Sequence, residues 1–322
     1  MATENNETPP ADVVIIGGGP AGMSAALTAG RALLNTVVVN AESPRNAVTT
    51  ASHGFLTRDG AHPTELLAVA KQQLGKYETV RYVNDTVSTA TAVENGFGSG
   101  FEAGFEITLA SGEKMLTRRL IVATGHADDL KRLDLPGIEA VYGKSVYPCM
   151  FCDGFEHRGE RLAMFGREGA IHYAPMGLLW TDDLIVFTNG ASLSPDQTAE
   201  LEAHGVAVHS EQIQHLESSD GTLTAVELVT GERIERDAGF ISDEYSEPAS
   251  TFAETLGVTS SLNDWGMMAL DATETGSTSV AGLHVIGDAR IGFSGLIAAA
   301  AEGAACAEGI VHEIASERWS KQ

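Results

Sequence analysis

The stretch that decides the fold is Asp12-Val13-Val14-Ile15-Ile16-Gly17-Gly18-Gly19-Pro20-Ala21-Gly22. Its apolar run leads into a turn with the spacing Gly-x-Gly-x-x-Gly, and an Ala-rich helical stretch follows to about Leu34. The next apolar run, Val37 to Val39, completes a series of strand, turn, helix and strand. This order is the βαβ unit of a Rossmann fold, so we predict an α/β chain with a parallel sheet.

Each glycine of the turn has a separate function in a dinucleotide site. Gly17 permits the tight turn, Gly19 lets the backbone approach a pyrophosphate, and Gly22 permits close packing of the helix. The N-terminus of the following helix, near Pro20 and Ala21, carries a partial positive charge that attracts the phosphates. We therefore predict dinucleotide binding, with a purely structural glycine turn as the alternative.

The ribose contact of such a site is ambiguous, because the second strand ends in Asn40-Ala41-Glu42. Glu42 is the stronger acceptor for ribose hydroxyls and Asn40 the weaker, and either residue also fits a solvated loop.

Two later apolar runs also end in polar turns. Leu120 to Val122 leads into Ala123-Thr124-Gly125, and Leu283 to Ile286 leads into Gly287-Asp288, before an Ala-rich helix from about Leu296 to Ala315. Asp288 would lie at the mouth of the same sheet and could bind the ribityl or phosphate part of a flavin dinucleotide. An ordinary turn aspartate is the alternative.

The middle of the chain contains a second, degenerate βαβ unit. An apolar run from Arg161 to Phe165 enters the turn Gly166-Arg167-Glu168-Gly169, and a helical stretch and the strand Leu184 to Phe187 follow. Before it, Val80 to Leu109 alternates polar and apolar residues, which predicts an antiparallel insert of short strands. A length of 322 residues favours two domains.

The motif Pro148-Cys149-Met150-Phe151-Cys152-Asp153-Gly154 carries the clearest chemistry. Two cysteines at this spacing can form a disulfide at the start of a helical turn, where the helix dipole favours thiolate. A zinc half-site is the rival, but zinc needs four ligands and the third cysteine, Cys306, lies in an Ala-rich helix. We therefore predict a redox pair and no metal. Asp153 could move protons for a leaving thiolate, or it could simply cap the helix.

The charge of the chain limits its partners. A net charge of −24, from 44 acidic and 20 basic residues, repels nucleic acid and anionic lipid. The sequence contains neither a long apolar run nor a signal peptide pattern, so we expect no membrane partner and a cytoplasmic location.

With these motifs in the same order, the chain resembles the thioredoxin reductase family over nearly its whole length. The resemblance also rests on Thr278 to Leu283 and Gly287-Asp288-Ala289. It implies two Rossmann-like, three-layer ββα domains, with an FAD-binding domain at 11–125 and 246–322 and a central domain carrying the cysteines at 126–245. It further implies FAD as cofactor, a homodimer, and electron exchange between FAD and the Cys149/Cys152 pair. By the same analogy Cys152 faces the flavin and Cys149 meets the substrate.

Three departures concern the expected NADPH site. Glu168 stands where the family has a glycine that lets the backbone approach the pyrophosphate, and its charge opposes the phosphates. No basic residue occupies Thr188-Asn189-Gly190, where the 2′-phosphate cluster should follow the strand. Pro175 falls within the helix that should face the phosphates and should shorten or kink it. We therefore predict little or no use of NADPH.

A narrower branch matches better. Ser43-Pro44-Arg45-Asn46, His53 to Gly60 and Trp180 to Asp183 look like the dithiol oxidases of gliotoxin and holomycin biosynthesis. This resemblance implies that Arg45 and Asn46 contact the cofactor, and that a small dithiol is oxidised by way of the cysteines and FAD at the expense of oxygen. Asp153 departs from that branch, which usually has a histidine there.

The function predicted is that of an FAD-dependent thiol/disulfide oxidoreductase whose partner is a thioredoxin-like protein or a small dithiol or disulfide. Oxygen or ferredoxin is the expected electron partner, since related branches without NADPH motifs use ferredoxin. His53 could approach the isoalloxazine or a substrate thiol, or could be structural, and His126, His157 and His172 are weaker candidate bases. The alternatives are an NADPH-dependent thioredoxin reductase and a non-catalytic flavin redox sensor.

Overall fold

The structure is a computed structural model that describes residues 10–94, 103–242, 245–262 and 268–320, without the side chain of Glu168. Its contacts divide the chain into two units. The first unit consists of Met1–Arg45, Thr64–Ala127 and Glu247–Gln322, and the second unit of Asn46–Pro63 and Asp128–Ser246. The CxxC motif and the segment containing His53 therefore both belong to the second unit.

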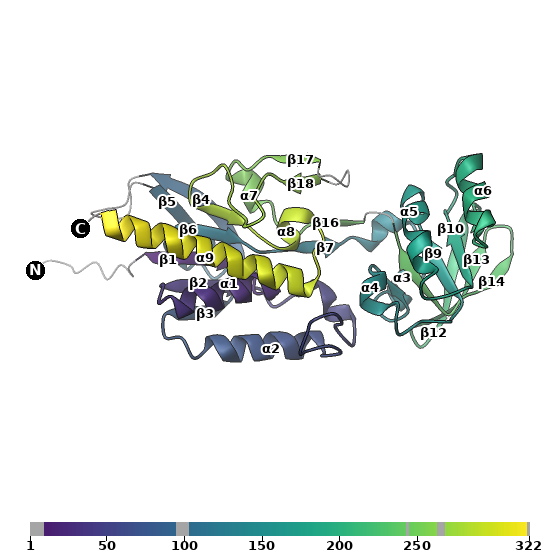
Figure 1. The fold of residues 1–322 in the computed structure, drawn as a ribbon, viewed down its shortest axis with the longest axis horizontal. Coiled ribbons are helices and arrows are strands. Elements are labelled where there is room, and N and C mark those ends of the chain that lie inside the picture. The colour runs from purple at the N-terminus through teal and green to yellow at the C-terminus, as the bar shows by residue number, and fades with distance from the viewer. Residues whose placement is uncertain (1–9, 95–102, 243–244, 263–267, 321–322) are drawn as a thin grey trace, which may run out of the picture. The chain divides into compact units, whose positions relative to one another are not determined.

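The main sheet of the first unit combines parallel and antiparallel strands in the order β3-β2-β1-β6-β5-β4 (Figure 1). The strand β19 also pairs with β6. Parallel pairs join β1 to β2, β2 to β3, β1 to β6 and β6 to β19. An antiparallel meander is formed by β4, β5 and β6. Their bounds are β1 (Ala11–Ile16), β2 (Thr36–Asn40), β3 (Val80–Asn84), β4 (Val87–Glu94), β5 (Ala103–Leu109), β6 (Lys114–Val122) and β19 (Leu283–Val285).

The remaining elements of this part of the chain are helices and short ribbons. The helices are α1 (Pro20–Arg31), α2 (Pro63–Leu74), α7 (Phe252–Thr255), α8 (Asp288–Ile291) and α9 (Leu296–Ser320), with a 3-10 turn at Arg45–Val48. The ribbon strands are β7 (His126–Asp128), β16 (Ser246–Pro248), β17 (Ser260–Leu262) and β18 (Met268–Leu270). Among the described residues, none of the helices has the length and apolar character that crossing a membrane requires.

One expectation about this sheet is wrong. The segment Val80–Asn84 does not join the antiparallel insert but lies parallel to β2, with Val80 opposite Thr36. The reason is the connection, because helix α2 carries the chain back along the sheet and a helical crossover joins parallel strands. The antiparallel part begins only at β4.

Apolar residues cover both faces of the sheet and form a three-layer arrangement. One core lies between the sheet and helices α1 and α9, and the other contains the meander and α7. Helices α1 and α9 pack closely because Gly303 has no side chain: a Cβ atom there would overlap the carbonyl oxygen of Ala21. The helix α9 thus rests directly on the first turn of α1.

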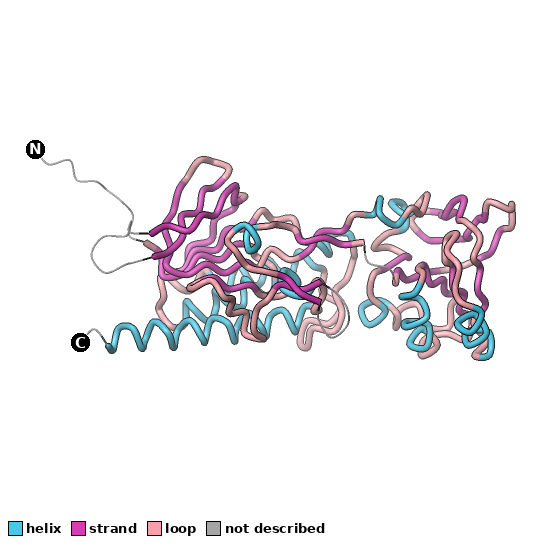
Figure 2. Tube along the Cα trace, turned by 90° about the horizontal axis from the view of Figure 1, so that it is seen from above, coloured by secondary structure: helices cyan, strands magenta, loops and turns pink. Residues whose placement is uncertain are grey.

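The second unit repeats the same three layers. Its five-stranded sheet is parallel throughout, in the order β11-β10-β9-β15-β8, and a separate antiparallel sheet has the order β12-β13-β14. Strands are magenta and helices cyan in Figure 2. One core lies toward the antiparallel sheet and another toward α5 and α6. Its strands are β8 (Val146–Tyr147), β9 (Leu162–Phe165), β10 (Leu184–Phe187), β11 (Ala207–His209), β12 (Ile213–Ser219), β13 (Thr222–Leu228), β14 (Arg233–Glu235) and β15 (Ala238–Ile241). Its helices are α3 (Ile138–Val141), α4 (Met150–Asp153), α5 (Glu168–Gly177) and α6 (Pro195–Ala203), with a 3-10 turn at Leu130–Leu133.

Candidate active site

The first glycine turn joins β1 to α1 in the first unit. The N–H of Gly17 donates to the carbonyl of Val39 at 2.8 Å, and a Cβ atom on Gly17 would overlap the carbonyl oxygen of Ala123. Gly19 is the N-cap of α1, and no atom lies within 4 Å of the position of its missing Cβ. No atom therefore fills the space beside Gly19 at the N-terminus of the 12-residue helix, and this space can take a phosphate.

The turn Ala123-Thr124-Gly125 follows β6 beside this first turn. The N–H of Ala123 donates to the carbonyl of Ile16 at 2.8 Å, so the second turn begins where β1 ends. The hydroxyl of Thr124 lies 2.7 Å from that of Ser250, and the carbonyl of Gly125 accepts a hydrogen bond from Ala249 at 3.0 Å. These bonds fix the turn to Ala249 and Ser250, which lie in the C-terminal part of the first unit.

The third turn, Gly287-Asp288, lies against the start of α1. A Cβ atom on Gly287 would lie 3.0 Å from the Cβ of Ala21. The N–H of Gly287 donates to the Glu302 carboxylate at 2.9 Å, and Arg290 pairs with the other oxygen of that carboxylate. The side chain of Glu302 is 8% exposed, so a buried ion pair fixes the turn. The sequence analysis did not identify Glu302.

Asp288 and Arg45 lie together beyond this turn. One carboxylate oxygen of Asp288 accepts hydrogen bonds from the N–H and hydroxyl of Ser294, at 2.9 and 2.7 Å. Its other oxygen lies 3.7 Å from Nη1 of Arg45, which also donates to the carbonyl of Gly292 at 3.2 Å. Asn46 belongs to the second unit, where its side chain donates to Ser52 at 3.3 Å.

The two candidates for the ribose contact have different surroundings. Asn40 accepts a hydrogen bond from the N–H of Gly18 at 3.1 Å and donates to the Tyr82 hydroxyl at 2.7 Å. Glu42 instead pairs with Lys71 at 2.8 Å and accepts from Asn84 at 2.9 Å. The hydrogen bond from Lys71 lowers the pKa of Glu42. Asn40 therefore touches the glycine turn, and Glu42 is a charged side chain at the end of the same strand.

These residues fit an adenine dinucleotide. Gly19 leaves open space at a helix N-terminus for the pyrophosphate, and three turns from distant parts of the sequence meet at the carboxyl ends of parallel strands. The first turn contains Gly17 and Gly19 and continues into the start of α1 at Pro20, Ala21 and Gly22. The other two turns contain Ala123, Thr124, Gly125, Gly287 and Asp288.

The cysteine pair occupies the start of α4 in the second unit. Cys149 and Cys152 form a disulfide, with Cα atoms 5.3 Å apart. Cys149 is the N-cap, and its sulfur accepts a hydrogen bond from the N–H of Cys152 at 3.1 Å. Cys149 is 9% exposed, whereas Phe151 between the cysteines is 75% exposed. A thiol that approaches the disulfide therefore meets an aromatic surface.

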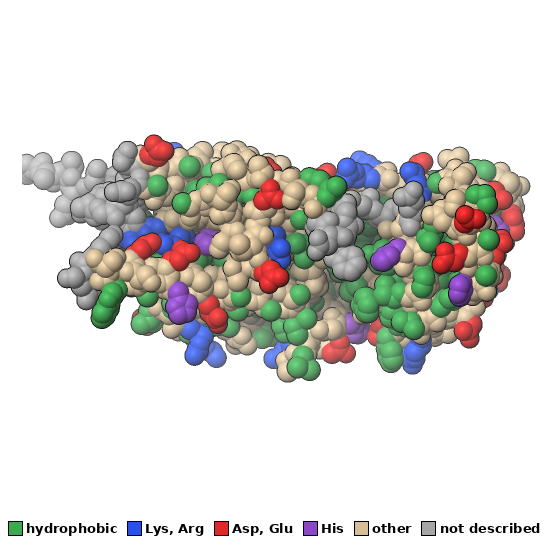
Figure 3. Space-filling view, turned by 45° about the horizontal axis from the view of Figure 1, so that its top comes forward, with side chains coloured by type: hydrophobic (Ala, Val, Ile, Leu, Met, Phe, Trp, Pro, Cys, Tyr) green, Lys and Arg blue, Asp and Glu red, His purple; other side chains and the backbone are tan. Residues whose placement is uncertain are grey.

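Trp180 packs against this motif. Its ring meets that of Phe151 edge-on, with centroids 6.0 Å apart. A Cβ atom on Gly154 would lie 3.0 Å from the indole, so glycine after Asp153 permits the contact. Phe155 and Leu179 are also exposed, and hydrophobic side chains gather over part of the second unit (Figure 3).

Asp153 is the acidic group nearest in sequence to the disulfide. Its pKa is raised to about 6, chiefly by burial; His53 and His157 lower this pKa, and Glu156 raises it. A carboxyl with this pKa exchanges protons near neutral pH, as proton transfer to and from thiols requires. The structure thus brings His53 and Asp153 into one group of interacting charges, although 100 residues separate them in the sequence.

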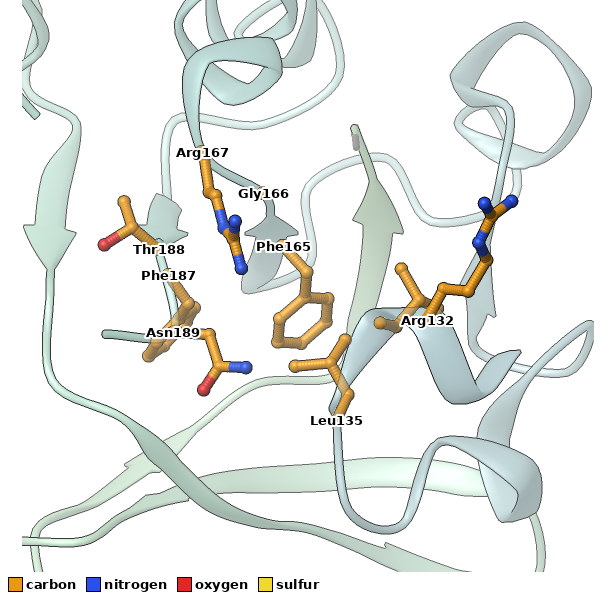
Figure 4. Close-up of a pocket in the computed structure, with 9 residues that line it drawn as sticks. Arg132, Leu135, Phe165, Gly166, Arg167, Phe187, Thr188 and Asn189 are labelled. Atoms are coloured by element: carbon orange, nitrogen blue, oxygen red, sulfur yellow. The ribbon is translucent and has the colours of Figure 1, made fainter. Parts of the chain in front are cut away.

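The degenerate turn of the second unit borders a cavity of about 300 Å³ (Figure 4). Its lining includes Arg132, Phe165, Gly166, Arg167 and Asn189. Figure 4 shows Arg167 and Asn189 directed toward the space in front of the phenyl ring of Phe165. The prediction that the Glu168 side chain obstructs this turn lies outside the described residues. Helix α5 does end at Gly177, two residues after Pro175.

Asn189 stands where the family's basic cluster was expected, and the nitrogen and the oxygen of its side-chain amide each form a hydrogen bond. Its amide nitrogen donates to the carbonyl of Asp134 at 2.9 Å, and its oxygen accepts from the N–H of Ile213 at 2.8 Å. Its φ of 48° is left-handed, a conformation that asparagine tolerates better than most residues. This side chain therefore joins the end of β10 to two neighbouring segments.

The fold and the disulfide together define a two-domain flavin-disulfide oxidoreductase, and comparison with known proteins agrees. The family model described as pyridine nucleotide-disulphide oxidoreductase matches residues 11–305. The chain belongs to this family. Its cofactor is FAD, and it is an FAD-dependent disulfide oxidoreductase with Cys149 and Cys152 as its dithiol pair.

Individual relatives match the chain from end to end. "Thioredoxin reductase aclD" of Aspergillus oryzae is 28% identical and covers 96% of this chain and 98% of its own. The TrxB structure of Bacillus anthracis has a TM-score of 0.87 and 33% identity over 96% of this chain and 99% of its own. The structure of HlmI has a TM-score of 0.88 and 29% identity over 98% and 97%. The predicted fold class and the resemblance to thioredoxin reductase-like proteins are confirmed.

Proposed function

We propose that this enzyme exchanges electrons between a thiol partner and FAD by way of the Cys149/Cys152 pair, with little or no use of NADPH. The observation that carries the proposal is Asn189, whose side chain is committed to Asp134 and Ile213 where an NADPH enzyme of this family needs cations. The intact glycine turn in the first unit and the disulfide in the second support a route for electrons between a thiol and FAD.

In this proposal the three turns of the first unit hold FAD, which supplies two-electron exchange with the disulfide. Gly19 admits the pyrophosphate, Asp288 and Arg45 bind the ribityl and phosphate region, and Asn46 and Glu42 are assigned to the same cofactor. The domain boundaries at 125 and 245 and a homodimer follow from the resemblance, and the proposed cytoplasmic location follows from the absence of a signal peptide pattern and of a long apolar run in the sequence.

The second unit supplies the thiol chemistry. Cys149 meets the substrate, Cys152 faces the flavin, and Asp153 accepts a proton from an incoming thiol or returns it to a leaving thiolate. The exposed ring of Phe151 supports an apolar contact with that substrate. The partner is a thioredoxin-like protein or a small dithiol, as the names of relatives such as thioredoxin reductase aclD suggest. Oxygen or ferredoxin is the proposed second electron partner.

One observation favours a second candidate, an NADPH-dependent thioredoxin reductase. The cavity beside the degenerate turn has two arginines, Arg132 and Arg167, in its lining, and cations attract phosphate.

An anaerobic panel distinguishes the candidates. Flavin absorbance is followed after addition of NADPH, NADH, reduced ferredoxin or a small dithiol. The thiol-driven enzyme is bleached by the dithiol and not by micromolar NADPH, whereas rapid bleaching by NADPH supports the second candidate. A redox sensor changes state once and shows no turnover with any pair of donor and acceptor.

A further inference from the structure

The strand β2 ends in a side chain that contacts the first glycine turn. The Oδ1 atom of Asn40 accepts a hydrogen bond from the N–H of Gly18 at 3.1 Å. A Cβ atom on Gly18 would lie 2.6 Å from Cγ of Asn40, so a residue with a side chain could not lie this close to the amide. Asn40 therefore holds the residue that joins Gly17 to Gly19.

The orientation of the Asn40 amide follows from its two partners. A backbone N–H can only donate, so the amide oxygen faces Gly18 and the amide nitrogen faces Tyr82 on β3. That nitrogen donates to the Tyr82 hydroxyl at 2.7 Å, and the hydroxyl in turn donates to Oε1 of Glu42 at 3.5 Å. The series of donors therefore runs from the glycine turn to a carboxylate.

Lys71 of α2 stabilises the far end of this series. Its ammonium nitrogen is 2.8 Å from Oε1 of Glu42 and lies over the Tyr82 ring, 4.1 Å from the ring centroid. The other carboxylate oxygen of Glu42 accepts from Asn84 at 2.9 Å. Since the side chains of Lys71 and Glu42 are 46% and 44% exposed, this ion pair contributes little to stability and serves to orient the phenol. The Tyr82 hydroxyl is therefore a fixed acceptor for Asn40.

These hydrogen bonds limit the donors that the turn can offer to a pyrophosphate. The N–H of Gly17 donates to a backbone carbonyl of β2, and that of Gly18 donates to Asn40. A pyrophosphate must therefore be bound from Gly19 onward, at the N-terminus of α1, where Pro20 has no N–H of its own. Asn40 restrains the backbone one residue before the first of these donors.

We propose that Asn40 is a positioning residue for FAD. It holds Gly18 so that the N–H of Gly19 points at the pyrophosphate, and Tyr82 holds Asn40 in the orientation that this requires. Asn40 thus acts on the cofactor through the backbone of the turn rather than by contact with the ribose. The inference rests on the proposed function only in placing FAD at the first glycine turn, and it is independent of the electron donor.

The test measures FAD affinity apart from turnover. FAD is removed from the full-length holoenzyme, and the apoprotein is titrated with FAD, followed by flavin fluorescence, and with ADP in competition, because ADP contains the same pyrophosphate. Thermal denaturation of each apoprotein measures its stability. The variants are Asn40→Leu, Tyr82→Phe and the double substitution. Asn35→Leu is the matched control, because this exposed asparagine precedes the same strand at its other end.

Asn40→Leu should weaken the binding of FAD and of ADP by the same factor, about five- to tenfold, as expected for the loss of one hydrogen bond that orders the turn. Tyr82→Phe should weaken both by about threefold, and the double variant should match Asn40→Leu, since Tyr82 acts only through Asn40. Asn35→Leu should bind both molecules as the wild type does.

A merely structural role would lower the melting temperature of the Asn40→Leu apoprotein and leave its affinities, measured well below that temperature, unchanged. Weaker binding of FAD with unchanged binding of ADP would contradict an action on the pyrophosphate. Effects of Asn40→Leu and Tyr82→Phe that add in the double variant would contradict the link through Tyr82. Tyr82→Phe removes a single oxygen atom, so if Asn40→Leu does not fold, unchanged affinity in Tyr82→Phe is enough to overturn the inference.

Gly19→Val separates this inference from the proposed function. If Gly19→Val loses FAD while Asn40→Leu binds it as the control does, the phosphate site stands and the role of Asn40 is wrong. If Gly19→Val retains full affinity, the first glycine turn is not the phosphate site, and the inference fails together with that part of the proposed function.

Discussion

A Cβ atom on Gly22 would overlap the carbonyl oxygen of Gly17, whereas a Cβ on Gly19 would meet no atom within 4 Å. The two glycines of one motif therefore differ in purpose. Gly22→Val should destabilise the first unit by about 3 kcal/mol or more, because backbone must move. Gly19→Val should leave the free energy of unfolding of the apoprotein nearly unchanged and reduce FAD affinity at least about tenfold, or about 1.4 kcal/mol. Thermal denaturation and flavin content measure both effects. Full flavin retention by Gly19→Val would remove this residue from the phosphate site.

The disulfide should be dispensable for the binding of FAD. Cys149→Ser and Cys152→Ser each should abolish thiol exchange and retain stoichiometric FAD, because the glycine turns lie in the other unit. Cys306→Ala is the control, since this buried cysteine in α9 forms no disulfide and should leave thiol exchange intact. Flavin absorbance and turnover with dithiothreitol are the measurements. Loss of FAD from both serine variants would indicate a structural disulfide instead.

Asp153 should make stability depend on pH in a defined direction. Burial raises its pKa from the ordinary 3.8 to about 6, so between these values the folded state binds more protons than the unfolded state. The ionisation of Asp153 therefore lowers the free energy of unfolding as the pH rises from 3.8 to about 6. Allowing for solvent screening, Asp153→Asn should be more stable than the wild type by about 1 to 2 kcal/mol at about pH 8 and by almost nothing near pH 4. Urea unfolding at both pH values measures the difference, and a constant difference would contradict the assignment.

We expect Glu302 to stabilise the conformation of the Gly287-Asp288 turn. Its carboxylate accepts the N–H of Gly287 and pairs with Arg290 in a buried position. Glu302→Ala leaves the partly buried cation of Arg290 and the backbone N–H of Gly287 without their acceptor, which should cost about 2 to 3 kcal/mol and increase the rate of FAD dissociation. Glu302→Gln keeps an acceptor for the N–H and should be milder in both respects. Equal FAD dissociation rates in the wild type and Glu302→Ala would show that the turn does not depend on this pair.

Asn189 should behave as a structural residue. Asn189→Ala removes two hydrogen bonds, to Asp134 and Ile213, and places alanine at a positive φ, so we expect a loss of about 2 kcal/mol in stability. Turnover driven by dithiols, measured well below the melting temperature, should remain within about twofold, or about 0.4 kcal/mol. A selective loss of activity without a change in melting temperature would assign Asn189 a role in binding.

The parts of the site that sequence predicts are those in which local backbone geometry limits the residue type. The turn from Gly17 to Gly22 and the pair Cys149/Cys152 belong to this kind, because their spacing, together with the flanking strand and helix patterns, indicates a phosphate turn and a disulfide. Each lies within a few residues of chain, so no knowledge of the tertiary fold is needed.

Contacts between distant segments could not be predicted in the same way. Glu156 and His53 meet only because the loop from Ser52 to Ala61 folds with the second unit, and neither residue belongs to a spacing pattern that involves the other. The same holds for Glu302 in an Ala-rich helix, where a lone carboxylate resembles a solvated one until the helix packs on Gly287. The orientation of Val80–Asn84 was predicted wrongly for a similar reason, since alternation of polar residues does not reveal strand direction.

The central claim is that electrons enter through Cys149 and Cys152 and not from a nicotinamide. The most direct measurement is stopped-flow flavin absorbance of the anaerobic holoenzyme, mixed in parallel with dithiothreitol and with micromolar NADPH. The account predicts bleaching by dithiothreitol that disappears in Cys149→Ser, and no bleaching by NADPH on the same time scale. Rapid bleaching by NADPH, or bleaching by dithiothreitol that survives in Cys149→Ser, would contradict it.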